Sequence, residues 1–580
     1  MKKPEVVDER KDIKYEECET EEQPPAYDDG LDAALEQIGG PTWWMWMVFL
    51  MASTPGVFNI WALTSYVFLS GELDHWCQIP ELKAANWTDA QIRNITTGSI
   101  TGKNCTAPDY DYAYLATLRY EEAMQNITNH PVSSRTTCTK YDYQDAGTSI
   151  VSEWDLVCDR LVMRSTVQMV VALGKFIGAL LFGFVADKWG RKCSFVISCA
   201  MYIIAGPLGG LIPNYWLFVV TRLFLGMAGS GCYNCAFTLL TEVSNAKRRT
   251  MLGILYNMSY PVGMLLLPLI AYFVRDWKTL QLALSFPALL LIICCWFIPE
   301  SPRWLLSQGR RDDAWAVVRQ ADKQLALTRT TPMGAVNGDA VTKPPQPEPE
   351  DDDRTFMERF MASFQRLASL LTNGELCKRL FICYYLWGVT AMTYYALSLN
   401  ADNFTADKYI YIAIAGALEA VSYVMPIPIL RWVGRRPTSG AMYLVSGISL
   451  LSIMAVPRDN SIVIMSIAMV GRLCISAVYS VIVLYTTELF PTVNRNTAVG
   501  TSSTMSHLGS IAAPYIVDLL GAIQWSIPST ICAVCSLGAG LLVLLLPETK
   551  GKELYDTVEE MERKAQRGDK VSLVNCCSCH

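Results

Sequence analysis

Residues 37–71 read QIGGPTWWMWMVFLMASTPGVFNIWALTSYVFLSG, and none of these 35 consecutive positions carries a charge. A helix of about 20 apolar residues crosses a lipid bilayer, so the stretch is long enough to span one. The whole 580-residue chain is also rich in apolar residues and poor in charge. Of its residues, 51% are hydrophobic and 18% are charged, whereas soluble domains carry about 25% charged residues. This composition excludes a soluble enzyme, a fibrous protein and a disordered chain. The net charge of −6 gives no sign of a nucleic-acid partner.

Eleven further apolar stretches follow the first, so the sequence predicts twelve transmembrane helices. They form two groups of six, in residues 42–298 and 378–546, on either side of a polar segment at 299–377. The expected fold class is an all-α membrane protein. The predicted spans lie near 42–70, 162–185, 193–212, 215–240, 250–273, 278–298, 378–400, 407–430, 437–456, 461–487, 497–518 and 525–546.

Lysine and arginine gather in alternate loops, and this sets the orientation because cytosolic loops carry the excess of these residues. We therefore expect both termini in the cytosol. Residues 1–41, with 13 acidic and 5 basic side chains, are expected to form a disordered acidic tail. Residues 299–377 are expected to form a cytosolic linker, and 547–580 a second cytosolic tail. The basic residues that decide the orientation are Lys188, Arg191, Lys192, Lys247, Arg248, Arg249, Arg431, Arg435 and Arg436.

The first loop, residues 71–161, falls on the extracellular side by the same rule. It contains four N-x-S/T glycosylation sequons and four of the nineteen cysteines. An even number of cysteines in an oxidising compartment predicts two disulfides, with three possible pairings. The sequons are at Asn86, Asn94, Asn104 and Asn126, and the cysteines are Cys77, Cys105, Cys138 and Cys158.

Short motifs recur in the two groups of spans at a nearly constant offset. Gly190-Arg191-Lys192 after span 2 returns as Gly434-Arg435-Arg436 after span 8, 244 residues later. Thr221-Arg222-Leu223 returns as Gly471-Arg472-Leu473, Thr241-Glu242 as Thr487-Glu488, and Pro299-Glu300-Ser301 as Pro547-Glu548-Thr549. Four matches in order at equivalent span ends predict two parallel six-helix halves. This is a secondary-transporter architecture, with a site near the midplane between the halves.

Three stretches resemble a known family. Residues 183–192, GFVADKWGRK, resemble the signature loop of the major facilitator superfamily. Residues 299–306, PESPRWLL, residues 486–495, TTELFPTVNR, and the large first loop resemble the organic anion, cation and carnitine transporters over residues 40–555. The resemblance implies a plasma-membrane carrier without a cofactor. It also implies a latch of the cytosolic gate, for which a purely topological role is the alternative, at Asp187, Arg191, Glu242, Glu488 and Arg495.

Few ionisable side chains lie inside the predicted spans, where a charge is costly unless it meets water or a partner. His507 sits mid-span where, by the resemblance, cation carriers have Asp and many anion carriers have Arg. It either hydrogen-bonds substrate or is a buried histidine without substrate contact. Arg472 either holds a substrate carboxylate or pairs with Glu419 as a structural bridge. Glu419 is a candidate for cation attraction or proton coupling, and Lys175 has no counterpart in the family pattern.

Aromatic side chains are the other material of the expected site, because their faces attract organic cations. The resemblance favours Tyr233, Phe237, Tyr394 and Tyr395 as cavity lining and Asn59 as a polar position in span 1. Ordinary helix packing is the alternative for each of them taken alone.

The expected function is transport of small organic ions, most simply organic cations or zwitterions such as carnitine-like molecules or amine conjugates. The alternatives are an organic anion transporter, or a receptor or scaffold that keeps the fold without transport. The spans contain no paired carboxylates, nucleophile–base set or metal cluster, so an enzyme is not expected. Pro24-Pro25-Ala26-Tyr27 in the N-terminal tail predicts a WW-domain ubiquitin ligase as a partner.

Overall fold

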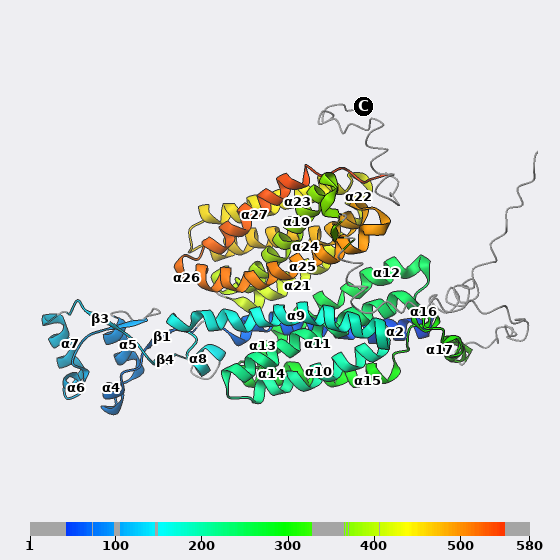
Figure 1. The fold of residues 1–580 in the computed structure, drawn as a ribbon. Helices are drawn as coiled ribbons and strands as arrows, with labels where there is room; N and C mark the ends of the chain where they lie inside the picture. Colours follow the sequence, from blue (N-terminus) through cyan, green and yellow to red (C-terminus); the bar gives the residue numbers. More distant parts are fainter. Residues whose placement is uncertain are drawn as a thin grey trace, which may run out of the picture.

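The structure is a computed structural model that describes residues 42–551 apart from 72, 98–104, 131, 145–148, 327–364, 366, 369 and 405–406. Within this part of the chain, eleven helices are long and apolar enough to cross a membrane. The twelfth expected span is the shorter apolar helix α27, Ile527–Val543. The all-α membrane fold class is therefore confirmed. Figure 1 shows the two groups of helices as two bodies, with the first loop at one end and α16 and α17 at the other.

The first half contains six predicted spans, three of which are broken. Span 1 is interrupted at Ser65, span 5 at Met258, and span 6 at a 3₁₀ turn around Pro287, whose ring removes a backbone donor. The elements are α2 (Trp43–Thr64), α3 (Tyr66–Leu69), η1 (Cys158–Arg160), α9 (Leu161–Trp189), α10 (Arg191–Leu211), α11 (Tyr215–Val243), α12 (Ala246–Asn257), α13 (Ser259–Phe273), α14 (Trp277–Ser285), η2 (Phe286–Leu289) and α15 (Leu290–Phe297).

The second half repeats this order. Its first helix begins at Gly374, four residues before the expected 378, because Asn373 caps it and the charged first turn extends beyond the apolar run. The elements are α19 (Gly374–Leu399), α20 (Ala401–Phe404), α21 (Lys408–Val424), α22 (Pro426–Trp432), α23 (Arg435–Ser452), η4 (Ile453–Ala455), α24 (Ser461–Leu489), α25 (Thr492–Tyr515), the π-helical turn η5 (Ile516–Leu520), α26 (Gly521–Ile523) and α27.

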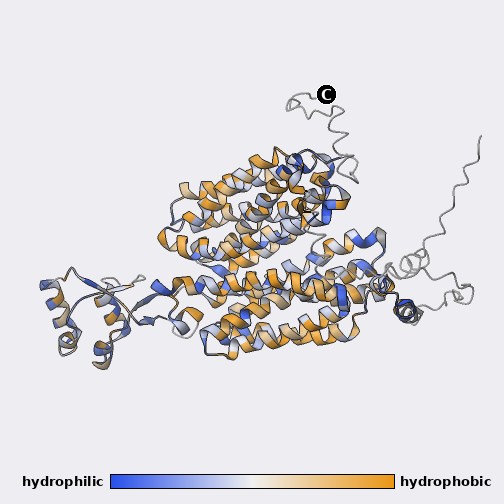
Figure 2. Ribbon diagram, in the orientation of Figure 1, coloured by the Kyte–Doolittle hydropathy of each residue, from blue (hydrophilic) through white to orange (hydrophobic). Residues whose placement is uncertain are grey.

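Glycines set the closest helix contacts within each half. Gly178 of α9 lies against the backbone of Met227 in α11, and Gly226 of α11 lies against Val171 in α9. Gly509 of α25 lies in the same way against Gly388 of α19. A Cβ at any of these positions would collide with backbone, so small residues allow the close approach that membrane helices use in place of hydrophobic collapse. Figure 2 shows apolar residues along the helices of both bodies.

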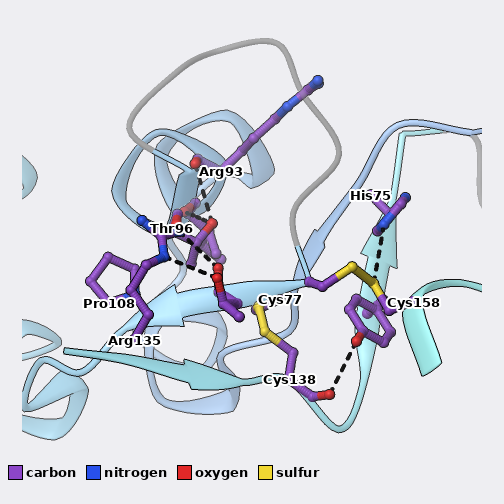
Figure 3. The surroundings of a disulfide bond; sticks show 12 residues. His75, Cys77, Arg93, Thr96, Pro108, Arg135, Cys138 and Cys158 are labelled. Carbon is purple, nitrogen blue, oxygen red and sulfur yellow. Dashed lines mark hydrogen bonds between the residues drawn. A yellow bond between two sulfur atoms is a disulfide. The ribbon is translucent and has the colours of Figure 1, made fainter. Parts of the chain in front are cut away.

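The first loop folds into a small domain of short elements at one end of the bundle, hereafter the loop end. Two antiparallel pairs organise it, β1 with β4 and β2 with β3. Cys77 is bonded to Cys138, and Cys105 to Cys158 (Figure 3). The elements are β1 (His75–Cys77), α4 (Pro80–Ala84), α5 (Asp89–Thr97), β2 (Thr106–Pro108), α6 (Tyr112–Leu115), α7 (Tyr120–Asn129), β3 (Arg135–Thr137), β4 (Tyr141–Tyr143) and α8 (Ile150–Trp154).

The predicted glycosylation sites in this domain differ in their surroundings. Asn86 is exposed, with a left-handed φ of 61°. Asn94 is half-buried and its amide donates a hydrogen bond to the Tyr120 hydroxyl, and Asn126 is half-buried on α7. Beside the second disulfide, burial lowers the pKa of His75, whose Nε2 faces the Cys158 sulfur (Figure 3). The fold therefore holds the neutral imidazole.

Removing the disulfide between Cys77 and Cys138 is expected to unfold the loop domain more readily. The bridge joins residues 61 positions apart, and closing a loop of that length stabilises a fold by about 4 kcal/mol. The double variant Cys77→Ser with Cys138→Ser should show faster protease cleavage within residues 71–161. Cys193→Ser, which removes an exposed free cysteine on α10, is the control, and equal cleavage of both variants would contradict the expectation.

The linker begins with two helices at the opposite end of the bundle, hereafter the linker end. They are α16 (Pro302–Ser307) and α17 (Arg311–Ala326), within the segment that was expected to form the cytosolic linker. The expected acidic tail of residues 1–41 with Pro24, Pro25 and Tyr27, the sequon at Asn104, most of the remaining linker and the tail beyond residue 551 lie outside the described residues.

Candidate functional site

An ionic network closes the linker end of the first half. The Arg191 guanidinium donates to Glu242 at 3.1 Å and to Asp187 at 2.9 Å, which ties α10 to α11 and α9. The Glu300 carboxylate, just before α16, accepts from the backbone N–H groups of Arg191 and Lys192 at the start of α10. Carboxylates at a helix N-terminus are stabilised by its unpaired N–H groups and its dipole.

The second half contains the same network. Arg435 donates to Glu488 at 2.9 Å, and Glu548 accepts from the backbone N–H groups of Arg435 and Arg436 at the start of α23. The residue before each arginine is a glycine with positive φ, 104° at Gly190 and 101° at Gly434, which ordinary side chains adopt at a cost.

The two networks place the predicted latch residues and add three others. Asp187, Arg191 and Glu242 meet in one half and Glu488 lies in the other, while Arg495 sits in the first turn of α25. Each of these ion pairs lies within one half. The latch prediction missed the carboxylates and the arginine that complete the repeat, although the repeated Pro-Glu-Ser/Thr and Gly-Arg motifs contained the signal. These residues are Glu300, Glu548 and Arg435.

The loop end is where hydrogen bonds join one half to the other. Asp518, in the π-helical turn η5, accepts from the Tyr66 hydroxyl at 2.8 Å and from the Ser165 hydroxyl at 2.9 Å. The Arg164 guanidinium lies 3.9 Å from the same carboxylate, and the side chains of both residues are less than 10% exposed. The Tyr409 ring packs on Phe68 beside them. The structure therefore has the two halves closed against each other at the loop end, and the sequence prediction did not include Asp518.

Arg472 and Glu419 meet in the middle of the second half. Arg472 Nη2 lies 3.7 Å from Glu419 Oε2, and Arg472 is 1% exposed and Glu419 4%. The guanidinium also donates to the Ser398 hydroxyl at 2.6 Å and lies over the Tyr394 ring at 4.8 Å. Glu419 accepts from Ser476 at 3.0 Å. The geometry contains the bridge that was one of the two alternatives for Arg472.

Tyrosines from both halves surround the interface beside this pair, and we call them the tyrosine cluster. The Tyr233 ring lies 5.0 Å from the Tyr260 ring. Tyr260 is on α13, which packs against α21 of the other half, the helix that carries Tyr423. Tyr395 is on α19, which packs against α24, the helix that carries Tyr479. The cluster consists of Tyr233, Tyr256, Tyr260, Tyr394, Tyr395, Tyr423 and Tyr479.

Two predicted lining residues support this cluster from within the first half. Asn59 is 2% exposed and donates to the Tyr260 hydroxyl at 2.6 Å. Phe237 is 38% exposed and its ring lies 5.2 Å from that of Tyr256. Asn59 is thus placed to hold the Tyr260 ring, and Phe237 lies at the margin of the cluster toward the linker end of α11.

His507 lies on α25 where this helix packs against α9 of the other half. Its ring is half-buried and lies 5.7 Å from the Phe176 ring. Lys175 precedes Phe176 on α9. His507 therefore faces the interface between the halves. Arg472 and Glu419 lie on two other helices, α24 and α21.

Residues 101–561 match the family described as Sugar (and other) transporter. The chain is 31% identical to the Organic cation transporter protein of Drosophila melanogaster over 92% of this chain and 94% of the relative. It is 30% identical to Solute carrier family 22 member 1 of Bos taurus over the same shares. The inward open conformation of the xylose transporter XylE from E. coli aligns with a TM-score of 0.57 and 16% identity over 90% of this chain and 99% of that one. The structural likeness shows the fold.

Proposed function

Because the chain belongs to the organic cation and anion transporter family of the major facilitator superfamily, we propose that it carries small organic ions across the plasma membrane by alternating access. The loop domain then faces the outside, and both termini and the linker face the cytosol. The substrate binds between the halves, near the tyrosine cluster. The family membership also agrees with the expectation that the protein is not an enzyme.

The observation that carries this proposal is the paired ionic network at the linker end together with the junction between the halves at the loop end. Each half is held as a unit by its own arginine, Arg191 or Arg435, while Asp518 joins the two units. Two rigid units that separate at one end while meeting at the other provide the rocking motion of alternating access. The structure then corresponds to the state closed toward the outside.

We propose organic cations or zwitterions as the substrate class. Aromatic faces attract a desolvated cationic head by about 2 kcal/mol, and the tyrosine cluster offers several such faces from both halves. The charge of Arg472 is opposed by that of Glu419, so this pair does not by itself select an anion. A receptor or scaffold without transport has no feature in its favour here, because the networks of both halves are complete.

Substitution of His507 is expected to change the selectivity of uptake. An Asp at this position adds a negative charge beside the interface and should favour cations, whereas Arg should favour anions, because each charge attracts its opposite in a partly desolvated site. The measurement is uptake of a mixed panel of radiolabelled cations, anions and zwitterions by cells expressing His507→Asp, His507→Arg or the unaltered chain. Unchanged selectivity in both variants would remove His507 from the site, and no uptake of any panel member by the unaltered chain would reject the transport proposal.

A further inference from the structure

The internal repeat pairs Lys175 with Glu419. The offset of 244 residues that relates Gly190 to Gly434 carries position 175 onto position 419, and both residues lie on the second helix of their half, α9 and α21. The same repeat relates Arg222 to Arg472. In the second half Glu419 faces Arg472. In the first half Lys175 occupies the position that corresponds to Glu419.

The two halves therefore differ in net charge at equivalent positions. Glu419 and Arg472 sum to zero, whereas Lys175 and Arg222 sum to two positive charges. Arg222 is 2% exposed and lies over the Phe218 ring at 5.1 Å. Within the described part of the chain, no ion pair joins Arg222 or Lys175 to an acid. The first half thus has two basic side chains at the positions where the second half has an acid and a base.

The position of Lys175 along α9 puts this charge at the interface between the halves. Arg164 meets Asp518 at the loop end, and Lys175 follows Arg164 by eleven residues, which is three helical turns on the same face or about 16 Å. His507 precedes Asp518 by the same eleven residues on α25, which runs in the opposite direction. Lys175 and His507 thus lie in the next layer below the loop-end junction, on two helices that pack against each other, and the Phe176 ring contacts the His507 ring in this layer.

Neither side chain is satisfied by the protein itself. Both are half-buried, and no hydrogen bond or ion pair to the Lys175 ammonium or the His507 ring is present among the described residues. An ammonium at this depth is costly without a partner of opposite charge. An imidazole beside it adds a second nitrogen able to donate a hydrogen bond. The partner that would satisfy both the Lys175 ammonium and the His507 ring is an anion.

We propose that Lys175 and His507 form a carboxylate-binding subsite of the transport site. The inference rests on the proposed function and narrows its substrate class to zwitterions: the carboxylate binds the ammonium and the imidazole, and the cationic head binds the tyrosine cluster. Lys175 lies on α9, which packs against α11, the helix that carries Tyr233, so the subsite is on the helix next to that part of the cluster. One substrate then contacts both halves at once, through α9 and α25.

The test compares two probes that differ only in the carboxylate, 4-(trimethylammonio)butanoate and butyltrimethylammonium. In Lys175→Gln the uptake of the carboxylate probe should fall about tenfold to a hundredfold, the worth of a hydrogen bond to a charged group. Butyltrimethylammonium uptake should stay within about twofold, because the cation site is untouched. Lys175→Arg, which keeps the charge, should retain the ratio of the two uptakes, and Lys83→Gln in the loop domain is the matched control.

A ratio that does not change in Lys175→Gln, or an equal loss of both probes at unchanged surface amount, would overturn the subsite. A second measurement is independent of transport: benzoate should stabilise the purified full-length protein against heat, and Lys175→Gln should abolish this stabilisation. Equal stabilisation of the variant also overturns the subsite. A third outcome separates the two proposals. If the unaltered chain takes up neither probe, and benzoate stabilises the unaltered chain but not Lys175→Gln, the subsite stands and the transport proposal fails.

Discussion

Replacing Glu419 with leucine is expected to destabilise the protein by about 3–5 kcal/mol, because it leaves the Arg472 guanidinium buried without a counter-charge. Arg472 is 1% exposed, and its other contacts are neutral: the Ser398 hydroxyl, the Tyr394 face and the Met264 sulfur. None of them compensates a full charge. The effect is measured as the rate at which the buried cysteines, such as Cys199 and Cys383, react with a thiol dye on heating.

The double variant Glu419→Leu with Arg472→Met separates a structural bridge from a substrate clamp. Replacing both members of a buried ion pair by apolar residues of similar volume is often neutral or stabilising, so the double variant should regain the thermal stability that the single variant loses. If it folds and still carries substrate, the pair is structural only. Loss of uptake in a stable double variant would assign the pair to transport, and a single variant as stable as the unaltered chain would contradict the bridge itself.

Much of the fold follows from the sequence because membrane helices obey few constraints. Apolar runs of sufficient length have to be helices, since lipid offers the backbone no partner, and the repeated motifs then give the two halves. The structure of the loop domain could not be predicted in this way. Its elements are three to ten residues long, and they depend on contacts that the hydrophobic pattern of the sequence does not reveal, such as the pairing of β1 with β4.

The site residues also divide into those that the sequence indicated and those that it did not. The family resemblance implied Arg191, Glu242 and Glu488, and the structure has them in ion pairs within each half. The repeated motifs contained the signal for Glu300 and Glu548, which the prediction did not include. Asp518 was not foreseen, because it falls at the end of a predicted span and lies in a π-helical turn that has no sequence signature. Single-turn π-helices are frequent at functional sites, so its place in the structure is more informative than its place in the sequence.

The sequence alone could not decide whether Arg472 pairs with Glu419 or with a substrate carboxylate. Arg472 had two roles open to it, and only the three-dimensional arrangement brings Glu419, Ser398 and Tyr394 around its guanidinium. In a span with few charges, the sequence identifies an ionisable residue whose burial is costly. It does not identify the neighbouring residue that compensates the charge.

Replacing Asp518 with alanine is expected to open the loop end. The carboxylate accepts two hydrogen bonds from the other half and lies near the Arg164 guanidinium. Hydrogen bonds to a charged group are worth about 1.5–3 kcal/mol each, and every 1.4 kcal/mol shifts an equilibrium about tenfold. The equilibrium constant for closure at the loop end should therefore fall by an order of magnitude or more, and the open fraction should rise. Thr166, whose hydroxyl lies 3.3 Å from that of Tyr515 across the junction, is the place for a reporter cysteine.

The measurement is the rate at which a membrane-impermeant maleimide modifies Thr166→Cys from the outside, with and without Asp518→Ala. The rate should rise with the open fraction, because the other half covers part of the reporter while the halves meet. Glu153→Ala is the matched control: Glu153 pairs with Lys278 at 2.7 Å at the same end, but within one half, so its loss should leave the labelling rate unchanged. Equal rates in Asp518→Ala and in its parent would show that the junction does not hold the halves together. Equal acceleration by both substitutions would show a local loosening of the loop end instead of a gate, because Asp518, unlike Glu153, joins separate rigid units.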